Sequence, residues 1–168
     1  MPIAVVRQSL LDLDAEAIVN AANTLMRGGG GIDGLIHQRA GHKLLLELQR
    51  VAPRRCEVGQ VVITPGFELK QKWILHVPGP IWRGGSHGEA DQLGACYRNA
   101  VEKAAEIGVQ SVGFCSISTG VYGFPIELAA PIALREVAPF ADRFEAVTFA
   151  MFGASEFEVF RDALAELA

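Results

Sequence analysis

The residues best suited to chemistry lie in one stretch, residues 20–34, with the sequence NAANTLMRGGGGIDG. It contains two asparagines, four consecutive glycines and one carboxylate, Asp33. Glycine is disfavoured inside helices and allows the backbone to approach a ligand closely, so the four glycines predict a loop. The apolar residues that follow predict a helix beginning near Ile32, whose first N–H groups and dipole favour an anion. We therefore expect an anion-binding loop here.

The alternative for this stretch is a flexible glycine-rich linker. A linker does not usually separate a buried strand from an amphipathic helix. Here the glycines lie between the apolar run 17–19 and a segment with Ile32, Leu35 and Ile36 at helical spacing. The pattern favours a loop shaped for a ligand.

A second loop of the same kind is predicted at residues 116–125, with the sequence SISTGVYGFP. It also joins a strand to a helix, and its hydroxyls and N–H groups can hold an anion. The chain has neither a Walker lysine nor a G-x-G-x-x-G after its first strand. Two such loops predict a diphosphate held by the protein without a metal. A tight turn before a helix would explain Gly120 and Gly123 alone but not the pairing of the two loops.

Alternating strands and helices position these loops. Strands are expected at residues 3–6, 17–19, 60–64, 72–77, 111–115 and 145–152. Helices are expected at 32–39, 44–51, 89–107, 125–137 and 155–167, the last opened by a capping box of Ser155 and Glu158. This alternation predicts an α/β fold, and an antiparallel pair at 60–77 would make the sheet mixed. The ligand should lie at the carboxyl ends of the strands, where both loops emerge.

Composition limits the class of protein. The 168 residues fit one domain, residues 1–168, and half of them are hydrophobic with no membrane-length apolar run. The N-terminus lacks a signal peptide, so we expect a cytoplasmic protein and, by default, a monomer. Three cysteines without C-x-x-C spacing argue against a disulfide framework and a metal site. A net charge of −4 argues against binding of long nucleic acid through its phosphates.

The segments AIVNAAN, GGGGIDGLIH and SISTGVYGFP together resemble the macrodomain family, and specifically its MacroD-type hydrolase branch. The resemblance covers nearly the whole chain. It implies a three-layer α/β/α sandwich with a mixed sheet of about six strands. It also implies ADP-ribose as the ligand, with no cofactor and no metal.

The resemblance also implies where the ligand is bound. Gly31, Ile32 and Asp33 would line the distal ribose, residues 118–122 would hold the diphosphate, and Phe152 would stack on adenine. Packing in the core is the alternative role for Phe152. The complete set of implied binding residues is Ser9, Leu10, Ala22, Gly30, Gly31, Ile32, Ser118, Thr119, Gly120, Val121, Tyr122 and Phe152.

The chain departs from the family at one place. The family's Gly-Asp pair, whose aspartate accepts the adenine amino group, falls on Gln8 and Ser9. Serine can accept a hydrogen bond but carries no charge. We therefore expect weaker recognition of adenine.

For hydrolysis, the resemblance points to Asn23, Asp33 and His37. Asp33 would orient or deprotonate a water at the distal ribose, Asn23 would hold the ribose hydroxyls, and His37 would support this group. An aspartate with a pKa of ~3.9 is a weak base, so burial or a substrate phosphate must assist. The alternative for His37 is a histidine bonded in the core. His76 is expected to be structural.

The implied activity is removal of single ADP-ribose units from acidic side chains of proteins, with deacetylation of O-acetyl-ADP-ribose. One alternative is a module that binds ADP-ribose without turnover. Another is hydrolysis of ADP-ribosylated nucleic acid ends, which a small acidic domain could reach one terminus at a time.

Overall fold

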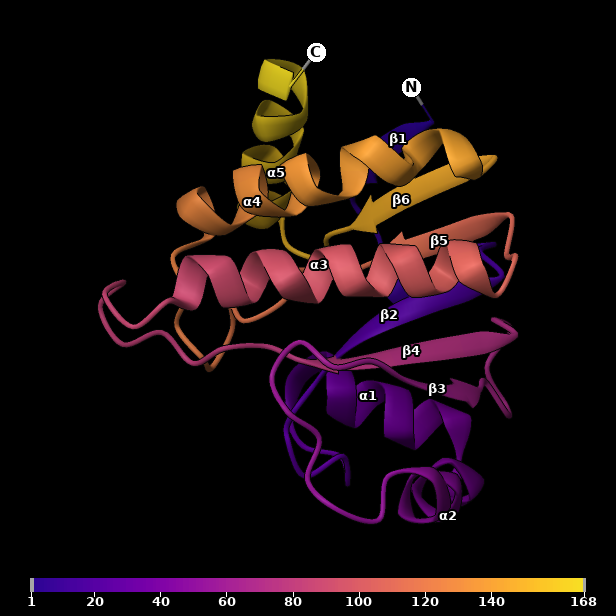
Figure 1. Cartoon of the computed structure of the whole chain (residues 1–168). Helices are drawn as coiled ribbons and strands as arrows, with labels where there is room; N and C mark the ends of the chain where they lie inside the picture. Colours follow the sequence, from indigo (N-terminus) through magenta and orange to yellow (C-terminus); the bar gives the residue numbers. More distant parts are fainter. Residues whose placement is uncertain (1, 168) are drawn as a thin grey trace.

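The computed structural model describes residues 2–167. Its six strands form one sheet in the order β1-β6-β5-β2-β4-β3 (Figure 1). The strands are β1 Ile3–Val6, β2 Ala17–Ala22, β3 Val62–Pro65, β4 Trp73–Pro78, β5 Ser111–Phe114 and β6 Ala146–Ala150. The α-helices are α1 Gly31–Ala40, α2 His42–Val51, α3 Glu89–Glu106, α4 Ile126–Val137 and α5 Ala154–Leu167, and two 3-10 helices are η1 Leu10–Asp12 and η2 Ala138–Arg143.

The sheet is mixed, as predicted. All neighbouring strands run parallel except β3, which pairs antiparallel with β4. The central strand β2 is apolar and buried along most of its length, as expected of a strand covered on both faces. In the register between β2 and β4, Asn20 lies opposite His76. This pairing brings two polar side chains into the middle of the sheet.

Helices cover both faces of the sheet and make the predicted α/β/α sandwich (Figure 1). Helices α3, α4 and α5 pack in succession, whereas α1 and α2 pack together beside β2 and β3. Between the sheet and α3 lies a group of buried rings: Phe114 stacks on Phe149 at 5.0 Å, and Tyr97 and Phe160 adjoin them. The Tyr97 hydroxyl accepts from Ile117 N at 2.8 Å, so the core also fixes the start of the second loop.

Two predicted boundaries are wrong in ways that matter for the site. Strand β2 continues three residues beyond Val19, because Asn20 still pairs with β4. Helix α5 begins at Ala154, so Ser155 lies inside the helix and does not cap it. The Glu156 carboxylate instead accepts from Gly153 N at 3.4 Å, which satisfies a donor at the helix start. In the described residues, no helix is long and apolar enough to cross a membrane.

Candidate functional site

A cavity of about 800 Å³ lies at the carboxyl ends of β2, β5 and β6. Both predicted loops line it, together with η1 and the start of α5. Every residue predicted to bind ligand is in its wall, as are Asn23 and Asp33: Ser9, Leu10, Ala22, Asn23, Gly30, Gly31, Ile32, Asp33, Ser118, Thr119, Gly120, Val121, Tyr122 and Phe152. Of the predicted residues, only His37 lies outside the wall.

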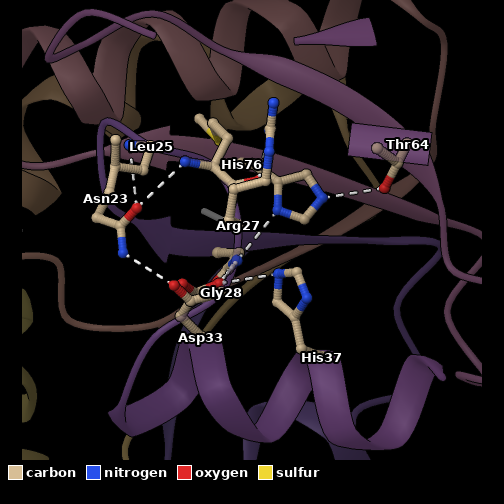
Figure 2. Close-up of polar contacts among 10 residues, drawn as sticks. Asn23, Leu25, Arg27, Gly28, Asp33, His37, Thr64 and His76 are labelled. Carbon is tan, nitrogen blue, oxygen red and sulfur yellow. Dashed lines mark hydrogen bonds and ion pairs between the residues drawn. The ribbon is translucent and has the colours of Figure 1, made fainter. Parts of the chain in front are cut away.

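The side chain of Asn23 shapes the first loop. Its Oδ1 accepts from the N–H groups of Leu25 and Met26, both at 3.1 Å, and its Nδ2 donates to Gly28 O at 3.0 Å (Figure 2). The sequence predicts a ligand contact for Asn23 and does not predict this internal role. Its Nδ2 has a second hydrogen that no hydrogen bond among residues 2–167 uses, so the amide can hold the loop and still donate into the cavity.

One glycine in each loop leaves open space beside it. A Cβ placed on Gly30 or on Gly120 would meet no atom within 4 Å. At Gly30 the φ angle of −95° is one that any residue adopts. Neither packing nor backbone conformation therefore requires glycine at Gly30, which fits a position where a ligand approaches the backbone.

Asp33 is the buried carboxylate of the site. It lies in the first turn of α1 and is 5% exposed. Its Oδ1 accepts from Asn20 Nδ2 at 2.8 Å and lies 3.5 Å from His37 Nε2 (Figure 2). Burial raises the pKa of Asp33, while the bond from Asn20 and the charge of His37 oppose that rise. A carboxylate with a raised pKa is a stronger base than an exposed one.

The two oxygens of Asp33 have different surroundings. Oδ1 is committed to Asn20, whereas Oδ2 accepts no hydrogen bond from any described residue. A Cβ on Gly29 would lie 3.1 Å from Asn23 Nδ2 and 3.5 Å from Asp33 Oδ2. The Asn23 amide and the free carboxylate oxygen therefore meet at one point of the cavity wall, and a water there could touch both.

His37 lies behind the carboxylate. Its side chain is 16% exposed and packs against the backbone of Gly28, where a Cβ would lie 3.4 Å from the ring. The ring packs inside the protein and also faces Asp33, so its position fits either of the two roles considered for His37. The predicted support of Asp33 is consistent with this position.

His76 is structural, as expected, but it belongs to the same polar chain. It is fully buried, with Nδ1 at 3.1 Å from Asn20 Nδ2 and Nε2 at 3.0 Å from Thr64 Oγ1 (Figure 2). Burial, with a smaller effect of the charge of His37, lowers the pKa of His76 to about 3. The ring is therefore neutral at physiological pH. His42 and His87 are exposed.

The second loop turns sharply over the cavity. Ser118 adopts a positive φ of 68°, and its buried Oγ has no partner among the described residues. The turn is held by bonds from Phe124 N to Ser118 O and from Gly123 N to Gly120 O, both 3.0 Å. Trp82 N donates to Tyr122 O at 2.9 Å, which ties the loop to the segment after β4. The loop is thus fixed by its backbone, and residues 118–122 line the cavity.

The far end of the cavity holds the predicted adenine-stacking residue. Phe152 is 80% exposed, which rules out core packing as its role. Ser9 caps η1, its Oγ accepting from Leu11 N at 3.3 Å. Sequence reasoning missed Glu156, whose side chain also lines this end. Its spacing of four residues from Phe152 at a helix start was the available signal.

The cysteines do not provide an activated nucleophile. All three are buried. Cys115 lines the cavity, but its thiol donates to Val19 O at 3.5 Å and burial raises its pKa to about 11. Within residues 2–167, no three His, Cys, Asp or Glu side chains are grouped closely enough to hold a metal ion.

The fold and the cavity define an α/β protein in which two glycine-containing loops and a buried carboxylate line one cavity at the carboxyl edge of the sheet. Residues 19–133 match the Macro domain family. The chain is therefore a member of the macrodomain family, as its motifs predicted.

Known proteins similar to this chain include named macrodomains. A macro domain-containing protein of Ralstonia nicotianae is 46% identical over 160 residues, covering 95% of this chain and 92% of that protein. A protein of Salmonella newport named O-acetyl-ADP-ribose deacetylase is 45% identical over 142 residues, covering 83% of this chain and 79% of that protein. Among solved structures, an Oceanobacillus iheyensis macrodomain mutant with ADPR has a TM-score of 0.91 at 35% identity, covering 98% of this chain and 92% of that one. A Trypanosoma brucei macrodomain in complex with ADP-ribose has a TM-score of 0.89 at 38% identity, covering 97% of this chain and 69% of that one.

Proposed function

We propose that this macrodomain binds ADP-ribose and hydrolyses single ADP-ribose units from acidic side chains of proteins, and that it deacetylates O-acetyl-ADP-ribose. The relatives named above support the ligand and the second reaction. The observation that carries the hydrolytic part is the free Oδ2 of Asp33, which faces the same point of the cavity as the Asn23 amide.

The proposed pose uses the whole cavity. Adenine would stack on the exposed ring of Phe152, close to Ser9 and Leu10. The diphosphate would lie between the two glycine loops, held by backbone N–H groups of residues 30–32 and by residues 118–122. The distal ribose would then reach Ala22, Asn23 and Asp33. The lining of the cavity by residues 118–122 and by Gly30, Gly31 and Ile32 supports this pose.

In the proposed reaction, Oδ2 of Asp33 takes a proton from a water whose oxygen attacks C1″ of the distal ribose. The bond from C1″ to the side-chain oxygen breaks, and the protein carboxylate leaves with the electron pair. Because a carboxylate is a stable leaving group, this step needs no general acid. With O-acetyl-ADP-ribose the water attacks the acetyl carbon instead, and the proton on Asp33 passes to the departing ribose oxygen.

Asn23 and His37 would assist Asp33. The unused hydrogen of Asn23 Nδ2 can bind a ribose hydroxyl or the water, which fixes the direction of attack. His37 lies near Oδ1, away from the attacking water, and helps keep the carboxylate ionised through its charge. Burial works in the opposite direction and raises the basicity of the carboxylate.

The decisive experiment compares two substrates that carry the same ADP-ribose group. One is a protein modified on glutamate, and the other is a nucleic acid with a modified terminal phosphate. Release of ADP-ribose from the protein supports the proposal. Release from the nucleic acid alone would move the activity to that substrate. Binding of ADP-ribose in calorimetry with no release from either would identify a binding module and reject hydrolysis.

A further inference from the structure

We propose that His76 is a positioning residue for hydrolysis: its neutral ring orients the Asn20 amide, and this amide fixes which oxygen of Asp33 is free to react. The inference rests on the proposed hydrolytic function. His76 does not line the cavity, so it would act only through the two residues between it and the ligand.

A continuous chain of hydrogen bonds carries this effect. The parallel register of β2 and β4 sets Asn20 opposite His76. Asn20 Nδ2 lies 3.1 Å from His76 Nδ1 and 2.8 Å from Asp33 Oδ1. At the other end of the ring, Nε2 lies 3.0 Å from Thr64 Oγ1, and Thr64 Oγ1 donates to Pro65 O at 3.0 Å. Asn20, Thr64 and His76 are 0% exposed, and Asp33 is 5% exposed.

Only one assignment of hydrogens satisfies this chain. An ionised Asp33 can only accept, so the group of Asn20 that faces it is the amide nitrogen and not its oxygen. The second hydrogen of Nδ2 then points at His76, so Nδ1 must be the acceptor. Nε2 therefore carries the ring hydrogen and donates to Thr64. The low pKa of His76 agrees with this neutral form.

The orientation of the Asn20 amide leaves one of its polar atoms unpaired, which indicates that its two donor contacts are held in place. Its Oδ1 is buried and has no hydrogen-bond partner among the described residues. An unpaired buried carbonyl is unfavourable, and the amide could relieve it only by giving up its two donor contacts. His76 and Asp33 thus hold the amide from both sides. This places Oδ1 of Asp33 on Asn20 and leaves Oδ2 toward Asn23 and the cavity.

Two substitutions of similar size separate positioning from simple packing. In His76→Asn, the side-chain oxygen can take the place of Nδ1 and still accept from Asn20. In His76→Gln, the amide group falls at the place of Nε2, so the contact with Thr64 is kept and the acceptor for Asn20 is lost. We expect His76→Asn to keep kcat within about threefold of wild type. We expect His76→Gln to lower kcat on the order of 10- to 10²-fold, because a misplaced catalytic group is costly.

Binding provides the matched readout. Because His76 is outside the cavity wall, both variants should bind ADP-ribose with wild-type Kd in calorimetry. Equal kcat values for the two variants, or a loss confined to ADP-ribose affinity, would overturn the positioning role. A Thr64→Val variant tests the chain from its far end, and it should lower kcat without changing Kd, since nothing then holds the ring hydrogen on Nε2.

Nitrogen NMR of wild-type protein labelled at histidine tests the geometry without any turnover. His76 should show an unprotonated Nδ1 and a protonated Nε2 throughout the range from about pH 5 to pH 8. The reverse tautomer or a charged ring would refute the proposal, even if the variants fail to fold. A wild-type protein with no hydrolytic activity would reject the proposed function, while these spectra would still decide how Asn20 is oriented.

Discussion

Asn20 of strand β2 donates through Nδ2 to Oδ1 of Asp33 in the first turn of helix α1, at 2.8 Å. This bond joins the middle of the sheet to α1, the helix that follows the glycine loop. It holds the carboxylate in a buried position. It leaves one oxygen of Asp33 bonded internally and the other facing the cavity. The catalytic hypothesis and the turnover predicted for the Asp33 variants depend on this difference.

Substitution of Asp33 should remove turnover and spare binding. We expect Asp33→Ala to lower kcat on the order of 10²-fold or more, because the group that accepts the water's proton is gone. Asp33→Asn is the matched control, since it keeps the shape and the acceptor for Asn20 but not the base. Both should bind ADP-ribose in calorimetry. Wild-type turnover in Asp33→Asn would reject the assigned role.

Asp33→Asn should also stabilise the fold. The folded-state pKa of Asp33 is raised, so the stability it contributes is full below the unfolded value of 3.8 and is lost as the pH rises through the folded value. At about pH 7 the protein therefore carries the cost of a buried charge, which Asp33→Asn removes. Urea unfolding should show the variant at least as stable as wild type at about pH 7, with less advantage near pH 4. A variant less stable than wild type at neutral pH would show that the buried charge of Asp33 does not destabilise the fold.

His76 should make stability depend on pH in the opposite direction. Its folded pKa of about 3 lies below the ordinary value of 6.5, so its contribution to stability is present above 6.5 and is lost as the pH falls toward 3. In that interval the stability of wild type should decline relative to His76→Asn by up to about 1.4 kcal/mol per pH unit. Urea unfolding at several pH values measures this. His42→Asn, at an exposed histidine, should show no such difference, and an equal slope in the two variants would place the effect elsewhere.

The sequence predicted the loops well because their causes are local. Four glycines before an apolar helical pattern require a loop, and a loop that follows a strand of an α/β sheet lies at its carboxyl edge. The contact between Asn20 and His76 could not be predicted in this way, since it joins residues 56 positions apart and depends on the register of two strands. The start of α5 was misplaced because Glu156 competes with Ser155 and Glu158 as the capping group, and only the backbone geometry decides among them.

The open glycines should be needed by the ligand and not by the fold. Gly30→Val and Gly120→Glu place side chains in space where the protein has no atoms within 4 Å of the Cβ, so both variants should fold with nearly wild-type thermal stability. Both should weaken ADP-ribose binding by narrowing the path of the diphosphate. Gly30→Ala supplies a graded control with a smaller loss. Calorimetry showing wild-type affinity in Gly30→Val would refute the two-loop arrangement of the diphosphate.

Ser9 is where the chain departs from its family, and a charge restored there should change adenine recognition. Ser9 Oγ already accepts from Leu11 N as the cap of η1, and this bond uses one of the two acceptor lone pairs of the hydroxyl. An aspartate has two oxygens, and one can keep the cap while the other accepts the adenine amino group. Hydrogen bonds to charged groups contribute about 1.5 to 3 kcal/mol against roughly 1 for neutral pairs. Ser9→Asp should therefore tighten ADP-ribose binding by up to about tenfold and sharpen the preference over the inosine analogue, which lacks that amino group.

Ser9→Asn caps a helix equally well without charge and should leave both affinities near wild type. Titration of both ligands into the three proteins decides this: if Ser9→Asp leaves the ratio of affinities unchanged, Ser9 does not face adenine, and the ring is recognised by other residues at this end of the cavity.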